Sequence, residues 1–315
     1  MKFTIAIPAY KANYLKECID SILAQTLSDF ELIIVNDASP EDIDSIVNLY
    51  SDSRIRYYKN DKNFGAEHVV DNWNKCLSYA EGEFFVLMGD DDMLEVNYLE
   101  EFDKLIEKHP ECNVYHCRSV IIDEKSEFIM LTETRPEVES VYENIWHRLF
   151  ISRTQFISDF VYNTESLKKK GGFYKLPLAW ASDDISSFIA STDKGVANTN
   201  HPVFKYRRHT LNISTTGNVK LKLDAILLEN SWIERFLEND YTQSENDLLL
   251  KKMIVKNLSR RLVKKIIYTL QINFKCLSLK GFIQILNFRK KYKITLNMLF
   301  FALLLSTKDR LTRNL

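Results

Sequence analysis

Three consecutive carboxylates that follow an apolar stretch are the strongest chemical feature of this sequence. Residues 84–88 are apolar, and Gly89 is followed by Asp90, Asp91 and Asp92. Asp is a poor strand residue, and three adjacent negative charges call for a partner of opposite charge. Hard divalent cations such as Mg²⁺ take oxygen ligands and are often held by one or two carboxylates plus substrate phosphates. The pattern leaves two interpretations open, a metal site or a solvated acidic turn in which Asp92 caps the next helix.

Strand and helix patterns alternate around this triplet over residues 1–120. Strands are expected at 3–7, 30–35, 55–59, 83–88 and 113–122, and helices at 14–25, 42–50, 66–80 and 96–108. This order predicts an α/β protein with a parallel, doubly wound sheet and helices on both faces. Such sheets bind ligands beyond the carboxyl ends of their strands. Three polar clusters fall at such ends, namely residues 8–10, Asp37 and the Asp triplet.

The C-terminal part differs sharply in charge from the rest of the chain. The 315 residues carry a net charge of −1, but residues 251–315 hold 16 Lys and Arg and one acid, Asp309. Residues 220–315 look wholly helical, and their basic residues are interleaved with Leu, Ile and Phe. Such a segment can face an anionic membrane or nucleic acid. The alternative is a helical subdomain packed on the rest of the protein, with Lys and Arg as a solvated rim.

Cysteine usage and the N-terminal sequence bear on the compartment. Five cysteines show no metal-type spacing and are interpreted as reduced thiols. No secretory signal pattern and no apolar run of about 18 residues is found. These features predict a cytoplasmic protein, and the basic segment adds the option of peripheral attachment to the inner face of the cell membrane.

Several motifs, taken together, resemble the bacterial-type family 2 glycosyltransferases of the GT-A fold over about residues 1–215. The markers are residues 5–10, residues 29–39, Asn63-Phe64-Gly65, residues 89–92, Ser182-Asp183-Asp184, and Tyr206-Arg207-Arg208-His209 with Asn212 and Ser214. The resemblance implies a Rossmann-like mixed sheet followed by a helical C-terminal region. It implies a catalytic domain at 1–217, with a nucleotide-sugar half up to about 120 and an acceptor half at 121–217, and a helical, basic region at 218–315.

The resemblance also assigns donor-binding and metal-binding roles. Pro8 and Tyr10 are expected to wall the nucleotide pocket, and Asp37 to accept a hydrogen bond from the base or ribose. The same pocket is expected to include Asn63, Asp90, Arg207 and Arg208, with Asp90 near the ribose and the two Arg near the phosphates. A divalent cation, Mn²⁺ or Mg²⁺, is expected at Asp91 and Asp92 with His209. The family pattern usually has Asp where Gly89 stands, so the resemblance leaves open which Asp binds the metal directly.

The catalytic base implied by the resemblance is Asp183, with Asp184 as the fallback. The family's Glu-Asp motif is here Ser182-Asp183, and the plain alternative is that Asp183 only caps the helix at 185–190. The implied activity is inverting transfer from a nucleotide-diphosphate sugar, with UDP as the expected nucleotide. The implied acceptor is a hydroxyl of a saccharide or lipid-linked saccharide in cell-surface glycan synthesis. A non-enzymatic basic membrane-binding or nucleic-acid-binding protein stays as the competing hypothesis, although the basic tail has no recognised nucleic-acid motif.

Overall fold

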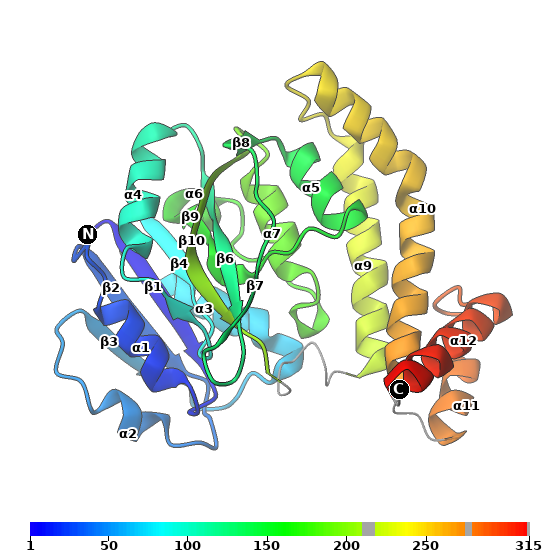
Figure 1. The fold of residues 1–315 in the computed structure, drawn as a ribbon, viewed down its shortest axis with the longest axis horizontal. Helices are drawn as coiled ribbons and strands as arrows, with labels where there is room; N and C mark the ends of the chain where they lie inside the picture. The colour runs from blue at the N-terminus through cyan, green and yellow to red at the C-terminus, as the bar shows by residue number, and fades with distance from the viewer. Residues whose placement is uncertain (210–217, 275–278, 314–315) are drawn as a thin grey trace.

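The computed structural model describes residues 1–209, 218–274 and 279–313. A sheet of ten strands, covered by helices on both faces, forms one end of the molecule, and long helices form the other (Figure 1). Asn212 and Ser214, which contributed to the last motif, lie outside the described residues.

The first half of the sheet is parallel. It contains β1 (Phe3–Ala9), β2 (Phe30–Asn36), β3 (Ile55–Lys59) and β4 (Phe84–Leu87), in the order β3-β2-β1-β4. Strands β1, β2 and β4 are almost wholly buried, because helices cover both faces of the sheet. Helices α1 (Leu15–Leu23), α2 (Ile43–Val47) and α4 (Tyr98–Lys108) pack on one face, and α3 (Val69–Tyr79) packs on the other. The strands and helices predicted for residues 1–122 are therefore confirmed to within a few residues.

The second half makes the sheet mixed. Strand β9 (Phe160–Asn163) lies antiparallel between β4 and β6 (Val114–Ile122), and β6 runs parallel to β10 (Val196–Arg207). Strands β5 (Met93–Leu94) and β8 (Val138–Glu139) pair antiparallel with β10, and β7 (Phe128–Leu131) with β6. The parallel order expected for the strands of residues 1–122 therefore holds for β1 to β4 and, in direction, for β6. The antiparallel strands make the sheet mixed, which confirms what the resemblance implies.

The remaining helices join the sheet to the far end of the molecule. Helices α5 (Val141–Phe150), α6 (Thr164–Lys169) and α7 (Ser182–Ala190) precede β10 or flank β9, and they are followed by α9 (Val219–Glu238), α10 (Glu245–Phe274), α11 (Leu279–Phe288) and α12 (Leu296–Arg313). One apolar cluster combines Ile145 of α5, Phe188 of α7, Trp232 of α9 and Ile254 of α10. The boundary predicted at 217 and 218 therefore separates two parts that share a core.

Two further observations concern the helices and the cysteines. Among the residues that the structure describes, no helix combines the length and the apolar character needed to cross a bilayer. Cys18, Cys76, Cys112 and Cys117 are buried free thiols.

Candidate active site

A cavity of about 740 Å³ lies at the carboxyl ends of β1, β2 and β4. Its far walls come from α5, α7 and α10 and from the turn at residues 177–181. The predicted site residues that line it are Pro8, Tyr10, Asp37, Asn63, Asp90, Asp91, Asp92, Asp183 and Asp184. The structure thus brings the three strand-end clusters together with the Asp pair that begins α7.

Asp37, at the end of β2, holds the loop that follows β3. Its carboxylate is buried and accepts hydrogen bonds from Asn60 Nδ2 at 2.8 Å and from the backbone N–H of Phe64 at 3.1 Å. Gly65 follows at a φ of 74°, a left-handed conformation that favours glycine. Asn63 lines the cavity from this loop, and Tyr10 lines it from the end of β1 with 41% of its surface exposed. These loops shape one wall of the cavity.

Two members of the Asp triplet fasten neighbouring strands. One oxygen of Asp90 accepts hydrogen bonds from the backbone N–H groups of Tyr10 and Lys11, both at 2.7 Å. Asp92 accepts one from the backbone N–H of Arg207 at 2.9 Å, which fixes the end of β10. Burial, together with the neighbouring charge of Asp91, raises the pKa of Asp90 to about 6 and raises the pKa of Asp92 well above its ordinary value. Both carboxylates therefore have a structural role, and the binding roles expected for Asp90 and Asp92 stay predictions.

Asp91 and His209 form the pair that best fits a divalent cation. Asp91 Oδ2 lies 2.7 Å from His209 Nε2 and 3.6 Å from Lys11 Nζ, so a carboxylate and an imidazole from distant segments meet at one point. Within the described segments, no group of three or more His, Cys, Asp or Glu side chains is placed to hold an ion without further ligands. An ion held by this pair would need further ligands, such as substrate phosphates and water.

Gly89 has a steric reason to be glycine. A Cβ atom at this position would lie 2.7 Å from Asp92 Oδ2 and 3.1 Å from Asp91 Oδ1. Both carboxylates fold back over the backbone of Gly89, so a side chain there would displace them. With Gly in place of the Asp of the family pattern, the two carboxylates can take these positions.

Arg207 lies behind the Asp triplet rather than in the cavity wall. Its guanidinium is fully buried, and it donates to the backbone oxygen of Asp91 at 2.8 Å, pairs with Glu17 at 2.8 Å and lies over the Tyr14 ring. Arg208 is exposed, and neither Arg lines the cavity. This placement gives no support to a phosphate contact by Arg207, and that role stays a prediction for both residues.

Asp183 and Asp184 begin α7, and their environments differ. Asp184 is buried and accepts hydrogen bonds from Arg148 Nε at 2.7 Å and Gln155 Nε2 at 2.9 Å. Burial alone would raise the pKa of Asp184, but the charge and hydrogen bond of Arg148 outweigh it and hold the pKa below its ordinary value. Asp183 borders the cavity, and burial beside the charge of Asp184 raises its pKa to about 7. The two carboxylates therefore differ in role. Asp184 is held by hydrogen bonds, and Asp183 is suited to exchange a proton.

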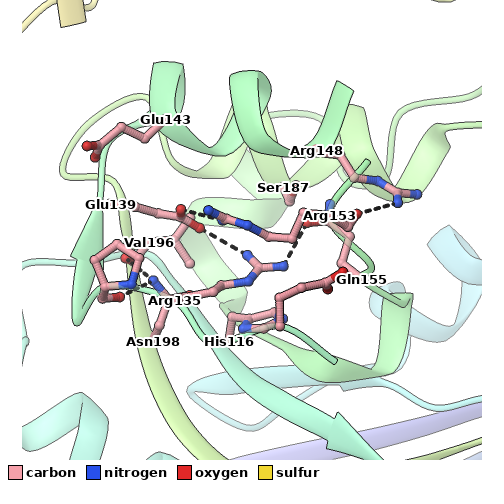
Figure 2. Close-up of polar contacts among 12 residues, drawn as sticks. His116, Arg135, Glu139, Glu143, Arg148, Arg153, Gln155, Ser187, Val196 and Asn198 are labelled. Atoms are coloured by element: carbon pink, nitrogen blue, oxygen red, sulfur yellow. Dashed lines mark hydrogen bonds and ion pairs between the residues drawn. The ribbon is translucent and has the colours of Figure 1, made fainter. Parts of the chain in front are cut away.

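A buried network contacts Asp184 through Gln155. Figure 2 labels its members Arg135, Glu139, Arg153 and Gln155. Gln155 joins Asp184 to Arg135, whose guanidinium donates to Gln155 Oε1 at 2.9 Å and to Glu139 at 3.0 Å. Arg153 pairs with the other oxygen of Glu139. Two buried cations thus share one buried carboxylate, and the chain of contacts ends at the residue beside Asp183.

The helical region adds a cation that sequence analysis did not assign to the site. Lys265 of α10 lines the cavity and pairs with Glu229 of α9, which also binds Arg261. Arg148, Gln155, Trp73 and Trp180 are further lining residues that were missed. The sequence holds only a weak indication of the role of Lys265. Arg261 and Lys265 share the inward side of α10 with Leu258, and this indicates that part of the basic excess faces inward.

The turn before α7 has an unusual backbone. Leu178, Ala179 and Ala181 all have φ between 50° and 72°, which is rare for residues other than glycine. This turn packs against the short turn at residues 66–68 on the other side of the cavity. Lys222 of α9 lies 5.0 Å from the centre of the Trp180 ring and supports it from behind. Strained segments of this kind persist where surrounding contacts hold them, often at functional sites.

Comparisons with known proteins agree with this arrangement. Residues 4–171 match the family described as Glycosyl transferase family 2. An uncharacterized glycosyltransferase of Rickettsia typhi is 34% identical over 125 residues, which are 39% of this chain and 38% of that protein. Chondroitin synthase of Pasteurella multocida is 36% identical over 100 residues, which are 31% of this chain and 10% of that protein. The matches thus span well under half the length of these relatives.

Solved structures share the fold at low sequence identity. S. aureus TarS 1-349 in complex with UDP-GlcNAc superposes with a TM-score of 0.65 at 15% identity, covering 99% of this chain and 92% of that one. The mannosyltransferase PcManGT of Pyrobaculum calidifontis, in complex with GDP-Man and Mn²⁺, gives 0.56 at 16% identity, covering 98% and 87%. The family match covers more than half of the chain, and the fold agrees with it. The chain belongs to glycosyltransferase family 2.

Proposed function

We propose that this protein is an inverting, metal-dependent glycosyltransferase that uses a nucleotide-diphosphate sugar and has Asp183 as its base. The observation that carries the proposal is that Asp183 and Asp91 line the same cavity, the first with a pKa raised to about 7 and the second beside His209. Family membership favours a transferase over the non-enzymatic binding protein that the sequence left open.

The donor is proposed to occupy the wall made by the ends of β1 and β2. Pro8, Tyr10, Asp37 and Asn63 line this part of the cavity, beside the Asp triplet. The related folds carry UDP or UDP-GlcNAc in TarS and GDP-Man with Mn²⁺ in PcManGT. The ligands of these related structures support a nucleotide sugar as the donor, and we propose a UDP-sugar.

The proposed reaction breaks the bond between the anomeric carbon and the diphosphate. Asp183 takes the proton of the acceptor hydroxyl while the hydroxyl oxygen forms a bond to the anomeric carbon. The oxygen attacks the face opposite the diphosphate, so the configuration at that carbon is inverted. The electron pair of the broken bond leaves with the diphosphate, where a divalent cation bound at Asp91 and His209 would neutralise charge as a Lewis acid. A pKa of about 7 suits a base at neutral pH, and Asp184 positions α7 through Arg148.

The acceptor is proposed to be a hydroxyl of a saccharide. Aromatic side chains line the cavity at Trp73, Trp180, Phe156 and Tyr206, and aromatic rings offer apolar faces to the C–H groups of a sugar. We extend the proposal to a saccharide or lipid-linked saccharide of the cell surface, made on the cytoplasmic side, with residues 251–315 placing the enzyme at an anionic membrane.

Thermal shift with nucleotide sugars tests the donor and metal assignments. UDP-, GDP- and dTDP-sugars are added with Mn²⁺ or with EDTA to the native protein, Asp91→Ala and the exposed control Asp29→Ala. Ligand binding to the folded state raises its stability, by about 2.7 kcal/mol at 100 times Kd. A shift that needs Mn²⁺, persists in the control and disappears in Asp91→Ala supports the proposal. An equal shift in EDTA rejects the metal role.

A further inference from the structure

The seven basic residues of α10 divide into two sets that face different surroundings. Lys251, Arg261 and Lys265 pair with acids from α9 or the segment after it, Asp240 for Lys251 and Glu229 for the other two. Lys252, Lys256, Arg260 and Lys264 are exposed. We call these four residues the α10 ridge. The basic excess therefore contains a part that is paired with acids of the same region and an exposed part.

The α10 ridge repeats every four residues, so its members lie one turn apart along the outer side of the helix. Across the described parts of the chain, no salt bridge or side-chain hydrogen bond engages any of the four. The α10 sequence has no acid after Asp247. Like charges one turn apart weaken a helix, and here three such pairs follow in succession. An anionic partner on this face would relieve the repulsion.

Exposed apolar side chains accompany the α10 ridge. Leu249, Met253 and Val263 are exposed by 58%, 42% and 41%, and each lies three residues from a ridge cation along the helix. In α12, Phe300 and Phe301 are adjacent and exposed by 59% and 55%. Figure 1 places α10, α11 and α12 at the end of the molecule away from the N-terminal strands. Large exposed apolar groups beside cations are typical of surfaces that enter a lipid interface.

We propose that the outward face of α10, built on the α10 ridge, is a docking surface for an anionic lipid bilayer. The cations attract anionic headgroups, and the interleaved Leu249, Met253 and Val263 enter the boundary between headgroups and acyl chains. A purely polyanionic partner would use the charges and leave the apolar groups in water. None of the ridge residues lines the cavity, so the proposal is independent of the catalytic one.

Co-sedimentation of the full chain with vesicles tests this surface. The vesicles contain phosphatidylcholine alone or with 30 mol% phosphatidylglycerol, at about 0.1 M and 0.5 M NaCl. The ridge variant is Lys256→Gln, Arg260→Gln and Lys264→Gln. The matched control removes three exposed charges elsewhere, Lys125→Gln, Lys169→Gln and Lys194→Gln. A third variant, Met253→Ser with Val263→Ser, removes apolar contacts and keeps every charge.

The ridge variant should bind anionic vesicles about 10²-fold more weakly, since each basic residue near such a surface contributes roughly fivefold and three of them are removed. Its melting temperature should stay unchanged or rise, because repulsion within α10 is relieved. The control should bind like the native protein, and the apolar variant should lose the part of binding that survives high salt. Equal binding by ridge variant and control overturns the proposal. The proposal is also overturned if the native protein binds heparin as well as it binds anionic vesicles and the apolar variant binds the vesicles like the native protein. That result would indicate a polyanion as the partner.

Discussion

At pH 8, Asp183→Asn should stabilise the folded protein, whereas Asp184→Asn should destabilise it. The pKa of Asp183 is raised from 3.8 to about 7, so the folded protein binds this proton more tightly than the unfolded chain does. The associated stability is present below the unfolded pKa of about 4 and is lost as the pH rises through about 7. At 1.36 kcal/mol for each step of one in pKa, the charged carboxylate costs the folded state up to about 4 kcal/mol at pH 8.

Asp183→Asn removes this cost because an amide stays neutral. The variant should therefore melt higher than the native protein at pH 8, by up to about 8 °C at roughly 2 °C per kcal/mol. The gain should shrink steadily as the pH falls and nearly vanish at about pH 4. Asp184→Asn should do the reverse at pH 8. It leaves Arg148 without its buried counter-charge, and breaking such a pair costs about 3 kcal/mol or more.

Thermal melts without donor, from pH 4 to pH 8, check both variants against the native protein. Turnover is measured in parallel, and Asp183→Asn should lose about 10²–10⁴-fold, since this is the usual contribution of a positioned base. Native turnover should rise with pH through about 7. Destabilisation by Asp183→Asn at pH 8 would refute the account of its environment. Near-normal turnover in Asp183→Asn, together with lost turnover in Asp184→Asn, would assign the role of catalytic base to Asp184.

Two further predictions concern stability and the Asp triplet. Ending the chain at Asp247 should cause unfolding or aggregation in a melting and light-scattering assay. It removes Ile254 from a shared core, where one such side chain contributes about 1.5–3 kcal/mol, and leaves Glu229 buried without its cations; a soluble, cooperatively melting fragment would contradict this packing. Gly89→Asp should lower nucleotide affinity in the thermal-shift assay because its Cβ would meet the carboxylates of Asp91 and Asp92, whereas the exposed control Asp29→Ala should leave it unchanged.

The site residues at the strand ends could be predicted because each directly follows an apolar run that is typical of a buried strand. The apolar run at residues 84–88 and the triplet after it identify both a strand and its carboxyl end, and Asp37 follows a buried strand in the same way. Parallel strands bring their carboxyl ends to one edge, so neighbours in the sheet become neighbours in the site. The placement of these side chains in one cavity follows from that rule.

The supporting residues could not be predicted, because nothing in their own segments indicates the long-range contacts. Arg148 and Gln155 reach Asp184 across about 30 residues or more, and Lys265 reaches the cavity from a helix whose cations face both inward and outward. Strand β9 has four residues, too short for a period-two pattern to separate it from a loop. Its antiparallel insertion depends on tertiary pairing with β4 and β6.

The shared walls of the cavity have a consequence for building hybrid enzymes. One wall belongs to the segment that matches the family, while Asp183, Asp184 and Lys265 lie beyond residue 171. A chimera joined at 217 would combine Lys265 of one parent with the Asp pair of the other and separate Lys222 from Trp180. A hybrid should therefore keep Arg148, Asp184, Glu229 and Lys265, together with the Arg135–Glu139 network behind them, within one parent.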